Sequence, residues 1–370
     1  MNPLKIFVGL CGSVRNGYES SSRGEGRWAL SLVRCLKDIP GMKIVMVPDT
    51  EPCDWGTCPK PDNVLMIQPH EKWKLDNAHF DLAIFTSWQT HKPEMKYIHA
   101  DKYLWGVMGW KHEIMKDGYF QDNEYVIRWF RADLPEIPYP INFQDRCFLL
   151  AQPFGPAFGQ NKFYNKRIAW VAKEAFLDTT NPSLSESAAR HLFAVVDVCK
   201  ETSAALSIFS CHEFSPKTSS RVVAMGILDK IKEYDNITMY PSLPYPEYQR
   251  ELQKCSVTIP LAFAGSTQEA IFYGLVPMLY KDSMFSNHPS IGDTCKNITD
   301  GKMSRFQSDE DKKNVLTHDE IKTVLRRLLT DYEAYTTTLG GLTPMVEDNV
   351  DSNVVSQLQE IIDHKKGIER

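Results

Sequence analysis

The sequence predicts an α/β protein made of two successive units, each built around a parallel β-sheet. Short apolar runs that suit buried strands alternate with segments whose apolar residues recur at helical spacing, the pattern of parallel strands joined by crossover helices. The alternation stops once, in residues 152–166, which are rich in Gly, Pro and Asn and have no periodicity, and then it restarts. A length of 370 residues also suits two domains at roughly 150 residues each. We therefore take residues 152–166 as a linker.

In the first half, short apolar runs predict strands, and an amphipathic segment between the first two predicts a helix. The apolar face of this helix has the spacing i, i+4, i+7, i+8 and consists of Trp28, Leu32, Cys35 and Leu36. A Pro-Gly pair at residues 40–41 ends it. The expected strands are residues 5–11, 43–47, 64–68, 81–86, 103–108 and 125–130.

In the second half, the same alternation predicts further strands and longer helices. Thr317 and Glu320 have capping-box spacing, which predicts a helix start there and an apolar face that runs to Tyr332. The expected helices are residues 187–200, 317–332 and 350–362. The expected strands are residues 167–172, 204–210, 237–240, 257–259 and 277–280.

Composition excludes several classes of function. A net charge of -5, with 24% charged residues, provides no basic field for nucleic acid. The longest apolar stretches, such as residues 256–265, are about half of the ~20 residues that a membrane helix needs. The nine cysteines are scattered, without the spacing of a zinc site. We expect reduced thiols, a cytoplasmic protein, no transmembrane segment and no metal.

The segment that points most directly to chemistry is residues 265–280, GSTQEAIFYGLVPMLY. A strand leads into small residues and then into a helix that Gly274 ends. A helix N-terminus offers free N–H donors and about half a positive charge, which suits a diphosphate. Ser266 and Glu269 have capping-box spacing, so Glu269 either caps its own helix or accepts the hydroxyls of a ribose. The two roles are compatible, and the sequence leaves both open.

This segment resembles the nucleotide-binding signature of the retaining GT-B glycosyltransferases of family 4, a G-x-x-x-E-A-x-x-x-G-x-P-V stretch. The residues that match are Gly265, Glu269, Ala270, Gly274 and Pro277, and the preceding residues 246–255 match a helix of the same signature. The order of elements also resembles the GT-B fold, two Rossmann-like domains facing an interdomain cleft. The resemblance implies an acceptor domain over residues 1–155 and a donor domain over residues 156–344. It also implies a C-terminal helix at about residues 345–370 that crosses back to the first domain.

The resemblance further implies a role for particular residues around a nucleotide-sugar donor. Expected diphosphate contacts are the helix start at Gly265, Ser266 and Thr267, the cation Lys173, and the loop residues Gly12 and Ser13. Glu269 would hold the ribose, and His112 the donor sugar, with His91 as its competitor. The base would lie near His212, Tyr240 and Leu243. Lys173 and His112 are the expected catalytic residues.

The sequence departs from the family pattern at two positions. Leu261 stands where the first of two glutamates is usual, so another group must do its work or the activity is altered. Lys173 stands where the family has an arginine, and it keeps the charge but not the bidentate fork. A solvated lysine at a strand end is an equally good interpretation of Lys173. The degree of divergence resembles that of virus-encoded members.

Two other motifs carry little weight. Gly24, Gly26 and Ala29 spell G-x-G-x-x-A, but a dozen residues separate them from the first strand, whereas a dinucleotide fingerprint needs its glycines in the turn itself. Asp309 and Asp311 spell D-x-D within a run of charged residues, which is typical of a solvated surface. We expect no cofactor from either motif.

The sequence therefore predicts a cytoplasmic, retaining hexosyltransferase. Its donor is a nucleotide diphosphate sugar, with GDP-mannose favoured over UDP-sugars by frequency in the family, and its acceptor is a glycan or glycoprotein. Closure around residues 152–166 would exclude water during transfer. Two alternatives stay open: a nucleotide-sugar epimerase on the same fold, and a non-catalytic protein that binds sugar nucleotides or glycans, which the residue at Leu261 suggests.

Overall fold

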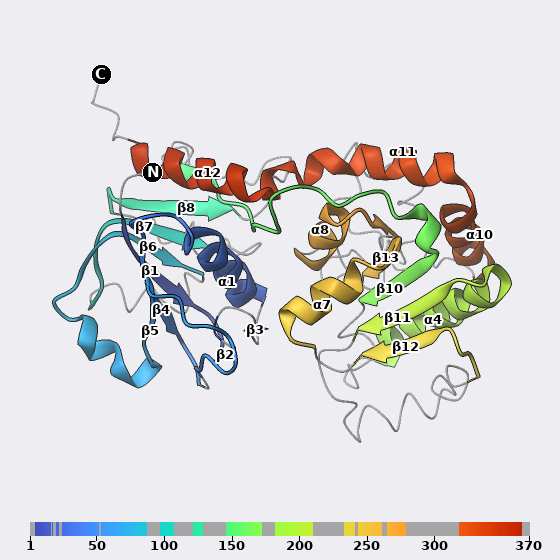
Figure 1. Ribbon diagram of the computed structural model, residues 1–370, viewed down its shortest axis with the longest axis horizontal. Helices are drawn as coiled ribbons and strands as arrows, with labels where there is room; N and C mark the ends of the chain where they lie inside the picture. The colour runs from blue at the N-terminus through green and yellow to red at the C-terminus, as the bar shows by residue number, and fades with distance from the viewer. Residues whose placement is uncertain are drawn as a thin grey trace. The chain divides into compact units, whose positions relative to one another are not determined.

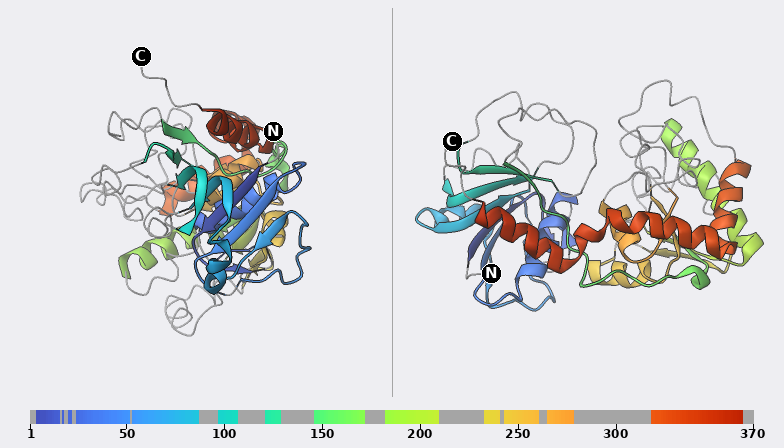
Figure 2. Two further views of the ribbon diagram at one scale, coloured as in Figure 1. Left: turned by 90° about the vertical axis from the view of Figure 1, so that its left-hand side faces the viewer. Right: turned by 90° about the horizontal axis from the view of Figure 1, so that it is seen from above.

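The computed structural model describes most of two compact units. Unit 1 comprises Met1–Ala157 and Asp348–Arg370, and unit 2 comprises Phe158–Glu347. Each unit has its own parallel sheet (Figures 1 and 2). The described residues are 4–15, 17, 20–21, 24–51, 53–86, 97–106, 121–128, 146–171, 182–209, 233–240, 243–260, 265–278 and 318–364.

The sheet of unit 1 has seven strands in the order β5-β4-β1-β6-β7-β8-β9. The bounds are β1 Lys5–Leu10, β4 Lys43–Pro48, β5 Val64–Met66, β6 His79–Phe85, β7 His99–Gly106, β8 Glu124–Arg128 and β9 Cys147–Leu149. All six predicted strands are present, within a few residues of their expected ends. Of the strands in this sheet only β9 was missed, although residues 147–151 (CFLLA) form a short apolar run. From β1 the chain moves outward to β4 and β5 and then returns to β6 on the other side of β1.

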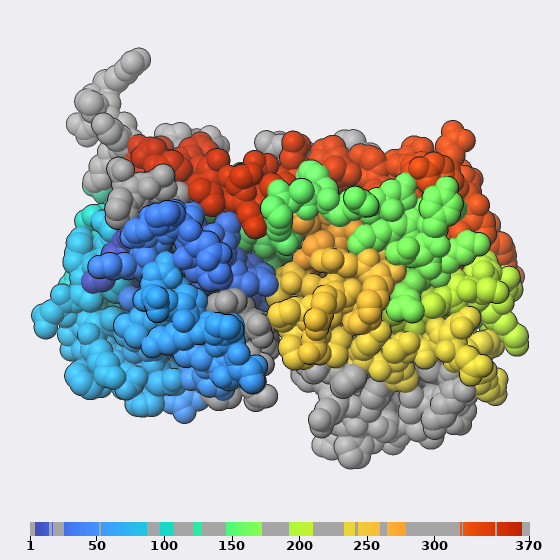
Figure 3. Space-filling model, in the orientation of Figure 1, coloured from blue at the N-terminus to red at the C-terminus, as the bar shows by residue number. Residues whose placement is uncertain are grey.

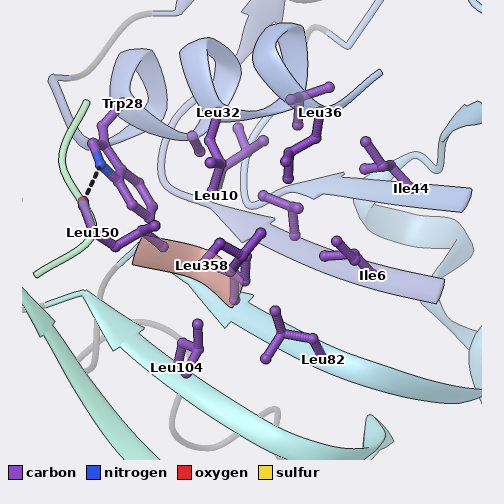
Figure 4. Packing of buried hydrophobic residues seen from close by; sticks show 14 of the residues in the cluster. Ile6, Leu10, Trp28, Leu32, Leu36, Ile44, Leu82, Leu104, Leu150 and Leu358 are labelled. Carbon is purple, nitrogen blue, oxygen red and sulfur yellow. Dashed lines mark hydrogen bonds between the residues drawn. The ribbon is translucent and has the colours of Figure 1, made fainter. Parts of the chain in front are cut away.

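Two helices, α1 (Gly24–Leu36) and α12 (Asp351–Asp363), pack on one face of this sheet. Trp28 of α1 is 1% exposed, and its indole Nε1 donates a hydrogen bond to the Leu150 carbonyl at 3.1 Å (Figure 4). Leu358 of α12 enters the same cluster and is fully buried. The last helix of the chain is therefore part of the core of unit 1. Lys102 fixes its C-terminal end, donating from Nζ to the carbonyls of three residues: Ile361, Ile362 and His364.

The opposite face of the sheet holds a second cluster, rich in aromatic rings, next to the 3₁₀ helix η1 (Pro69–Leu75). Phe85 and Trp105 stack there at 4.5 Å between ring centroids. Between β1 and α1 the chain forms a short antiparallel hairpin, β2 (Val14–Arg15) and β3 (Ser20–Ser21), which the sequence did not predict. Gly24 and Gly26 lie inside α1 rather than in a turn after β1, which agrees with rejecting the dinucleotide fingerprint.

The sheet of unit 2 has five parallel strands in the order β12-β11-β10-β13-β14. The strand bounds are β10 Arg167–Val171, β11 Ala205–Phe209, β12 Ile237–Tyr240, β13 Val257–Pro260 and β14 Val276–Pro277. The helix bounds are α4 Pro182–Thr202, α7 Tyr245–Leu252, α8 Gly265–Phe272, α10 His318–Thr330 and α11 Tyr332–Leu342, with η4 Phe163–Asn165 and η8 Thr343–Met345. The short helix η9, Glu347–Asn349, spans the boundary between unit 2 and unit 1. These strands and helices confirm the predicted order of elements.

One predicted helix boundary in unit 2 is wrong. The face expected to run to Tyr332 ends with α10, because Asp331 starts a new helix by accepting the Ala334 amide at 3.0 Å. Tyr332 is the first residue of α11 and is 49% exposed. Tyr332 thus continues the helical spacing of the apolar residues of α10 by chance, although the N-cap Asp331 separates it from that helix.

Residues 152–166 contain the boundary between the two units, which lies between Ala157 and Phe158, and the segment is packed on both sides of that boundary. On the unit 1 side, Asn349 donates to the Gln152 carbonyl at 2.7 Å. On the unit 2 side, the Gly159 amide donates to the Phe272 carbonyl at 2.7 Å. The segment then crosses the surface of unit 2 beside α11, as its green and orange-red atoms show (Figure 3). At Gly159 the glycine reflects close packing of backbone on backbone, because a Cβ there would lie 2.3 Å from the Tyr273 carbonyl oxygen.

Three absences hold for the described part of the chain. No helix within it combines the length and apolar character that a membrane span requires. Its seven cysteines are all free thiols, with no disulfide among them. Among the same residues, no group of three His, Cys, Asp or Glu side chains is placed to hold a metal ion.

Candidate functional site

The carboxyl end of the unit 2 sheet is where this topology places a ligand. From the central strand β10 the chain continues to β11 and β12 on one side and later to β13 and β14 on the other. The carboxyl ends of β10 and β13 are neighbours, with Val171 paired to Pro260. Ligands of open parallel sheets bind at such a switch point, where the connections diverge to opposite sides. The helix that follows β13 at this point is α8.

Helix α8 begins at Gly265, as the sequence predicted, and presents its first turn at this edge. Gly265 and Ser266 are half-buried, whereas Thr267 is fully buried. The first amides of a helix have no partner within the helix and carry its partial positive charge. Gly274 ends the helix region with a φ of 88°, and a Cβ there would lie 2.4 Å from the Gln160 carbonyl oxygen. The α8 start is thus compatible with an anion.

Glu269 lies one turn into α8 and is only 3% exposed. Its Oε1 accepts a hydrogen bond from the Tyr245 hydroxyl at 2.6 Å and another from Gln249 Nε2 at 3.3 Å. Gln249 also donates to the Tyr273 hydroxyl at 2.5 Å. The carboxylate therefore joins α8 to α7. Its role at a ribose stays a prediction.

An aromatic cluster continues from α7 to the carboxyl ends of β11 and β12. Phe209 stacks on Tyr240 at 5.1 Å and meets Tyr248 edge-on at 5.3 Å. Tyr248 in turn stacks on Tyr245, at 6.3 Å. Leu243 is half-buried and stands two residues before α7. The structure thus brings the predicted residues Tyr240, Leu243 and Glu269 to one edge, through aromatic residues that the sequence did not single out.

A polar contact anchors this cluster on the side of Tyr240. Its hydroxyl donates to Glu251 Oε2 at 2.7 Å. Burial raises the pKa of Tyr240, and the neighbouring Glu251 carboxylate adds to the rise. Hydrogen bonds from Lys254 and Tyr240 lower the pKa of Glu251. Both groups therefore keep the protonation states that this bond needs at neutral pH.

The site residues of α7 that the sequence analysis missed share a recognisable spacing. Tyr245, Tyr248 and Gln249 stand at i, i+3 and i+4, which is one face of a helix. That helix directly precedes β13 and α8 in the chain. A polar and aromatic stripe next to a predicted ligand helix could have identified these residues.

The equivalent edge of unit 1 lies between β1 and β6, where its connections diverge. Gly12 follows β1 with a φ of 91°, which favours glycine. Its amide donates to Asp49 Oδ1 at 2.5 Å, and the Cys11 amide donates to Thr86 Oγ1 at 2.9 Å. Ser13 is 9% exposed. Gly12 and Ser13 thus lie at the predicted edge, and Asp49 is a residue that the sequence analysis missed.

Several predicted site residues lie outside the described residues. They are His91, His112, Lys173, His212, Leu261, Asp309 and Asp311. Their expected roles stay predictions.

Comparison with known proteins identifies the fold. No protein-family model matches the chain, and no curated protein does. Among solved structures, sucrose-phosphate synthase from Thermosynechococcus elongatus matches at a TM-score of 0.58 and 10% identity, covering 96% of this chain and 98% of that one. A putative UDP-N-acetylglucosamine 2-epimerase from Listeria monocytogenes matches at a TM-score of 0.53 and 11% identity, and the match covers 99% of this chain and 98% of that one. A mutant O-GlcNAc transferase of Thermobaculum terrenum matches at a TM-score of 0.52 and 12% identity, and the match covers 97% of this chain and 68% of that one. The predicted fold class is confirmed: the chain has the two parallel-sheet α/β units of the GT-B fold.

Proposed function

We propose that this protein is a glycosyltransferase that takes a hexose from a nucleotide diphosphate sugar. The observation that carries the proposal is the start of α8 at the switch point of the unit 2 sheet, with Gly265 and Ser266 only half-buried. Glycosyl transfer requires a diphosphate to leave an anomeric carbon as negative charge develops on its oxygens. Helix amides that are already oriented stabilise such charge without reorganising. The aromatic cluster around Tyr240 offers flat surfaces for the base.

The finer features of the proposal follow the sequence resemblance. They are a retaining mechanism of the family 4 type, GDP-mannose in preference to UDP-sugars, and a glycan or glycoprotein acceptor. Lys173 and His112 are the proposed catalytic contacts, and His212 belongs to the proposed base site. The reaction as proposed uses neither a cofactor nor a metal and takes place in the cytoplasm. Nucleic acid is not a proposed partner.

A nucleotide-sugar epimerase is the second candidate. It is favoured by the likeness to the Listeria monocytogenes protein, in which almost the full length of both chains is covered. The two activities differ in their need for an acceptor. An epimerase converts the sugar nucleotide into its epimer with no acceptor present, whereas a transferase gives only slow hydrolysis.

Calorimetric titration with a panel of GDP- and UDP-sugars tests the proposal, and two variants of one residue test the site. Ser266→Pro removes one amide from the first turn of α8, where proline is compatible with the helix. Ser266→Ala removes only the hydroxyl and keeps the amide. We expect at least one nucleotide sugar to bind, and Ser266→Pro to bind it about tenfold more weakly than Ser266→Ala, a difference of about 1.4 kcal/mol.

Two results would contradict the proposal. If no sugar nucleotide of the panel binds, the proposed function is wrong. If binding occurs but Ser266→Pro and Ser266→Ala have equal affinities, the α8 amide is not a diphosphate contact. Binding without release of nucleoside diphosphate, in the presence of a broad set of glycan acceptors, would instead support the non-catalytic alternative.

A further inference from the structure

The Asp49 carboxylate accepts a hydrogen bond from the backbone amide of Gly12, in the loop that follows β1 in unit 1. Asp49 follows β4, and its own amide donates to the Leu10 carbonyl at 3.0 Å, which holds it beside the end of β1. Its Oδ1 accepts the Gly12 amide at 2.5 Å. On the other side, the fully buried Thr86 accepts the Cys11 amide. Side chains from both neighbouring strands therefore engage the two amides that follow β1.

The loop that contains Gly12 lies where a parallel sheet of this kind can bind an anion. Backbone amides after the first strand of such sheets, next to a glycine with positive φ, are suited to bind anions. Here the anion is part of the protein. A phosphate at Gly12 would have to displace Asp49 or lie beside it, and two negative groups at hydrogen-bonding distance repel each other strongly. The bond from the Gly12 amide to Asp49 therefore argues against the donor-diphosphate contact that the sequence led us to expect at Gly12.

The surroundings reinforce this negative character. Glu51 and Asp54 are exposed on the same connection as Asp49. Burial raises the pKa of the Cys53 thiol, and the negative charges of Glu51, Asp54 and Asp49 raise it further. The hairpin strand β2 is held against the same connection, because the Asp54 amide donates to the Val14 carbonyl at 3.2 Å.

We propose that Asp49 determines acceptor specificity: it fills the anion position of the Gly12 loop, excludes phosphate-bearing acceptors and favours hydroxyl or ammonium groups of uncharged or cationic sugars. Asp49 is half-buried rather than fully enclosed. Within the described residues its Oδ2 has no hydrogen-bond partner, and this oxygen is the one that a donor group of the acceptor would meet. The part of the proposal that concerns the acceptor rests on the proposed function. The electrostatic part, exclusion of phosphate from the Gly12 amide by Asp49, does not.

The electrostatic part can be tested with inorganic phosphate and no nucleotide sugar. The probe is the amide resonance of Gly12 in the ¹⁵N-labelled full-length protein. We expect phosphate to leave this resonance unmoved in the wild type and in Glu51→Gln, which removes a nearby exposed charge. In Asp49→Ala, phosphate should shift this resonance. The affinity for phosphate obtained from that shift should be at least tenfold higher than the highest affinity that the wild-type titration allows. Equal phosphate binding at Gly12 in the wild type and in Asp49→Ala, or no binding in either, overturns the inference.

The acceptor part needs the donor found in the nucleotide-sugar panel. The readout is the ratio of kcat/KM for an unphosphorylated sugar to kcat/KM for the same sugar as its 1-phosphate. Asp49→Asn keeps an oxygen that can accept the Gly12 amide but removes the charge, so it guards against loss of the loop structure. We expect the wild-type ratio to exceed ten, to fall at least tenfold in Asp49→Asn, and to stay unchanged in Glu51→Gln.

The possible failures can be distinguished. An unchanged ratio in Asp49→Asn contradicts the role of Asp49 in acceptor choice, while the donor assignment still stands. Absence of nucleotide-sugar binding contradicts the proposed function, whereas the phosphate titration still decides whether Asp49 fills the loop.

Discussion

Replacing Tyr245 by phenylalanine should weaken the connection between α7 and α8. The substitution removes one hydroxyl that donates to Glu269 Oε1 at 2.6 Å, between side chains that are 8% and 3% exposed. A hydrogen bond to a charged group contributes about 1.5–3 kcal/mol to stability. The carboxylate keeps the Gln249 bond at 3.3 Å, so it is not left without a donor. We therefore expect a loss of about 2 kcal/mol from the free energy of unfolding.

Chemical denaturation and thermal unfolding measure this loss. For a unit the size of Phe158–Glu347, a loss of about 2 kcal/mol lowers Tm by roughly 4–8 °C. Tyr164→Phe is the matched control, since its ring is 80% exposed and the same atom is removed. The control should change stability by less than about 0.5 kcal/mol. If Tyr245→Phe costs no more than Tyr164→Phe, Glu269 does not depend on this hydrogen bond.

The same pair of helices separates the two roles left open for Glu269. Glu269→Gln and Tyr245→Phe should both lower stability, because each weakens the bond between α7 and α8. A role at the ribose adds a loss of nucleotide affinity that is larger for Glu269→Gln than for Tyr245→Phe. Equal, small losses of affinity in the two variants would leave Glu269 with a structural role only.

Two further predictions concern packing and pH. A Cβ on Gly159 would lie 2.3 Å from the Tyr273 carbonyl oxygen, so Gly159→Ala should destabilise unit 2 by several kcal/mol, about 2–4. Gly340→Ala, inside α11 with nothing within 4 Å of its Cβ, should instead stabilise it by about 0.5–1 kcal/mol, and denaturation curves of both variants check the pair. Burial raises the pKa values of Cys199 and Cys255 from 9.0 to about 12, so the folded state keeps thiol protons that the unfolded chain loses. The free energy of unfolding should therefore decrease from about pH 9 to pH 12, and less steeply in Cys199→Ala/Cys255→Ala, as denaturation across that range would show.

Much of the fold could be predicted from local sequence patterns. Buried parallel strands need continuous apolar runs, so β1, β10 and β13 were visible without tertiary information. The helical period of Val354, Leu358 and Ile361 predicted α12 for the same reason. The prediction failed where a polar cap interrupted an apolar pattern, as at Asp331 between α10 and α11.

The site was harder to predict than the fold. The start of α8 could be found because its small residues and Gly274 lie within one continuous segment. The groups that define the chemistry of the two edges meet across long stretches of chain. Tyr245 and Glu269 are 24 residues apart, and Gly12 and Asp49 are 37 residues apart. No local pattern states which carboxylate will meet which donor, so these contacts appear only once the sheets are formed.

The most direct test of the central claim follows three backbone amides at the start of α8. In ¹⁵N-labelled protein, the amide resonances of Gly265, Ser266 and Thr267 are recorded during titration with GDP and with UDP. Helix amides that bind the diphosphate should show the largest shifts in unit 2 and saturate together with at least one of the two nucleotides. If either nucleotide binds while these three resonances stay unmoved, the diphosphate is held elsewhere and the account of this edge is wrong.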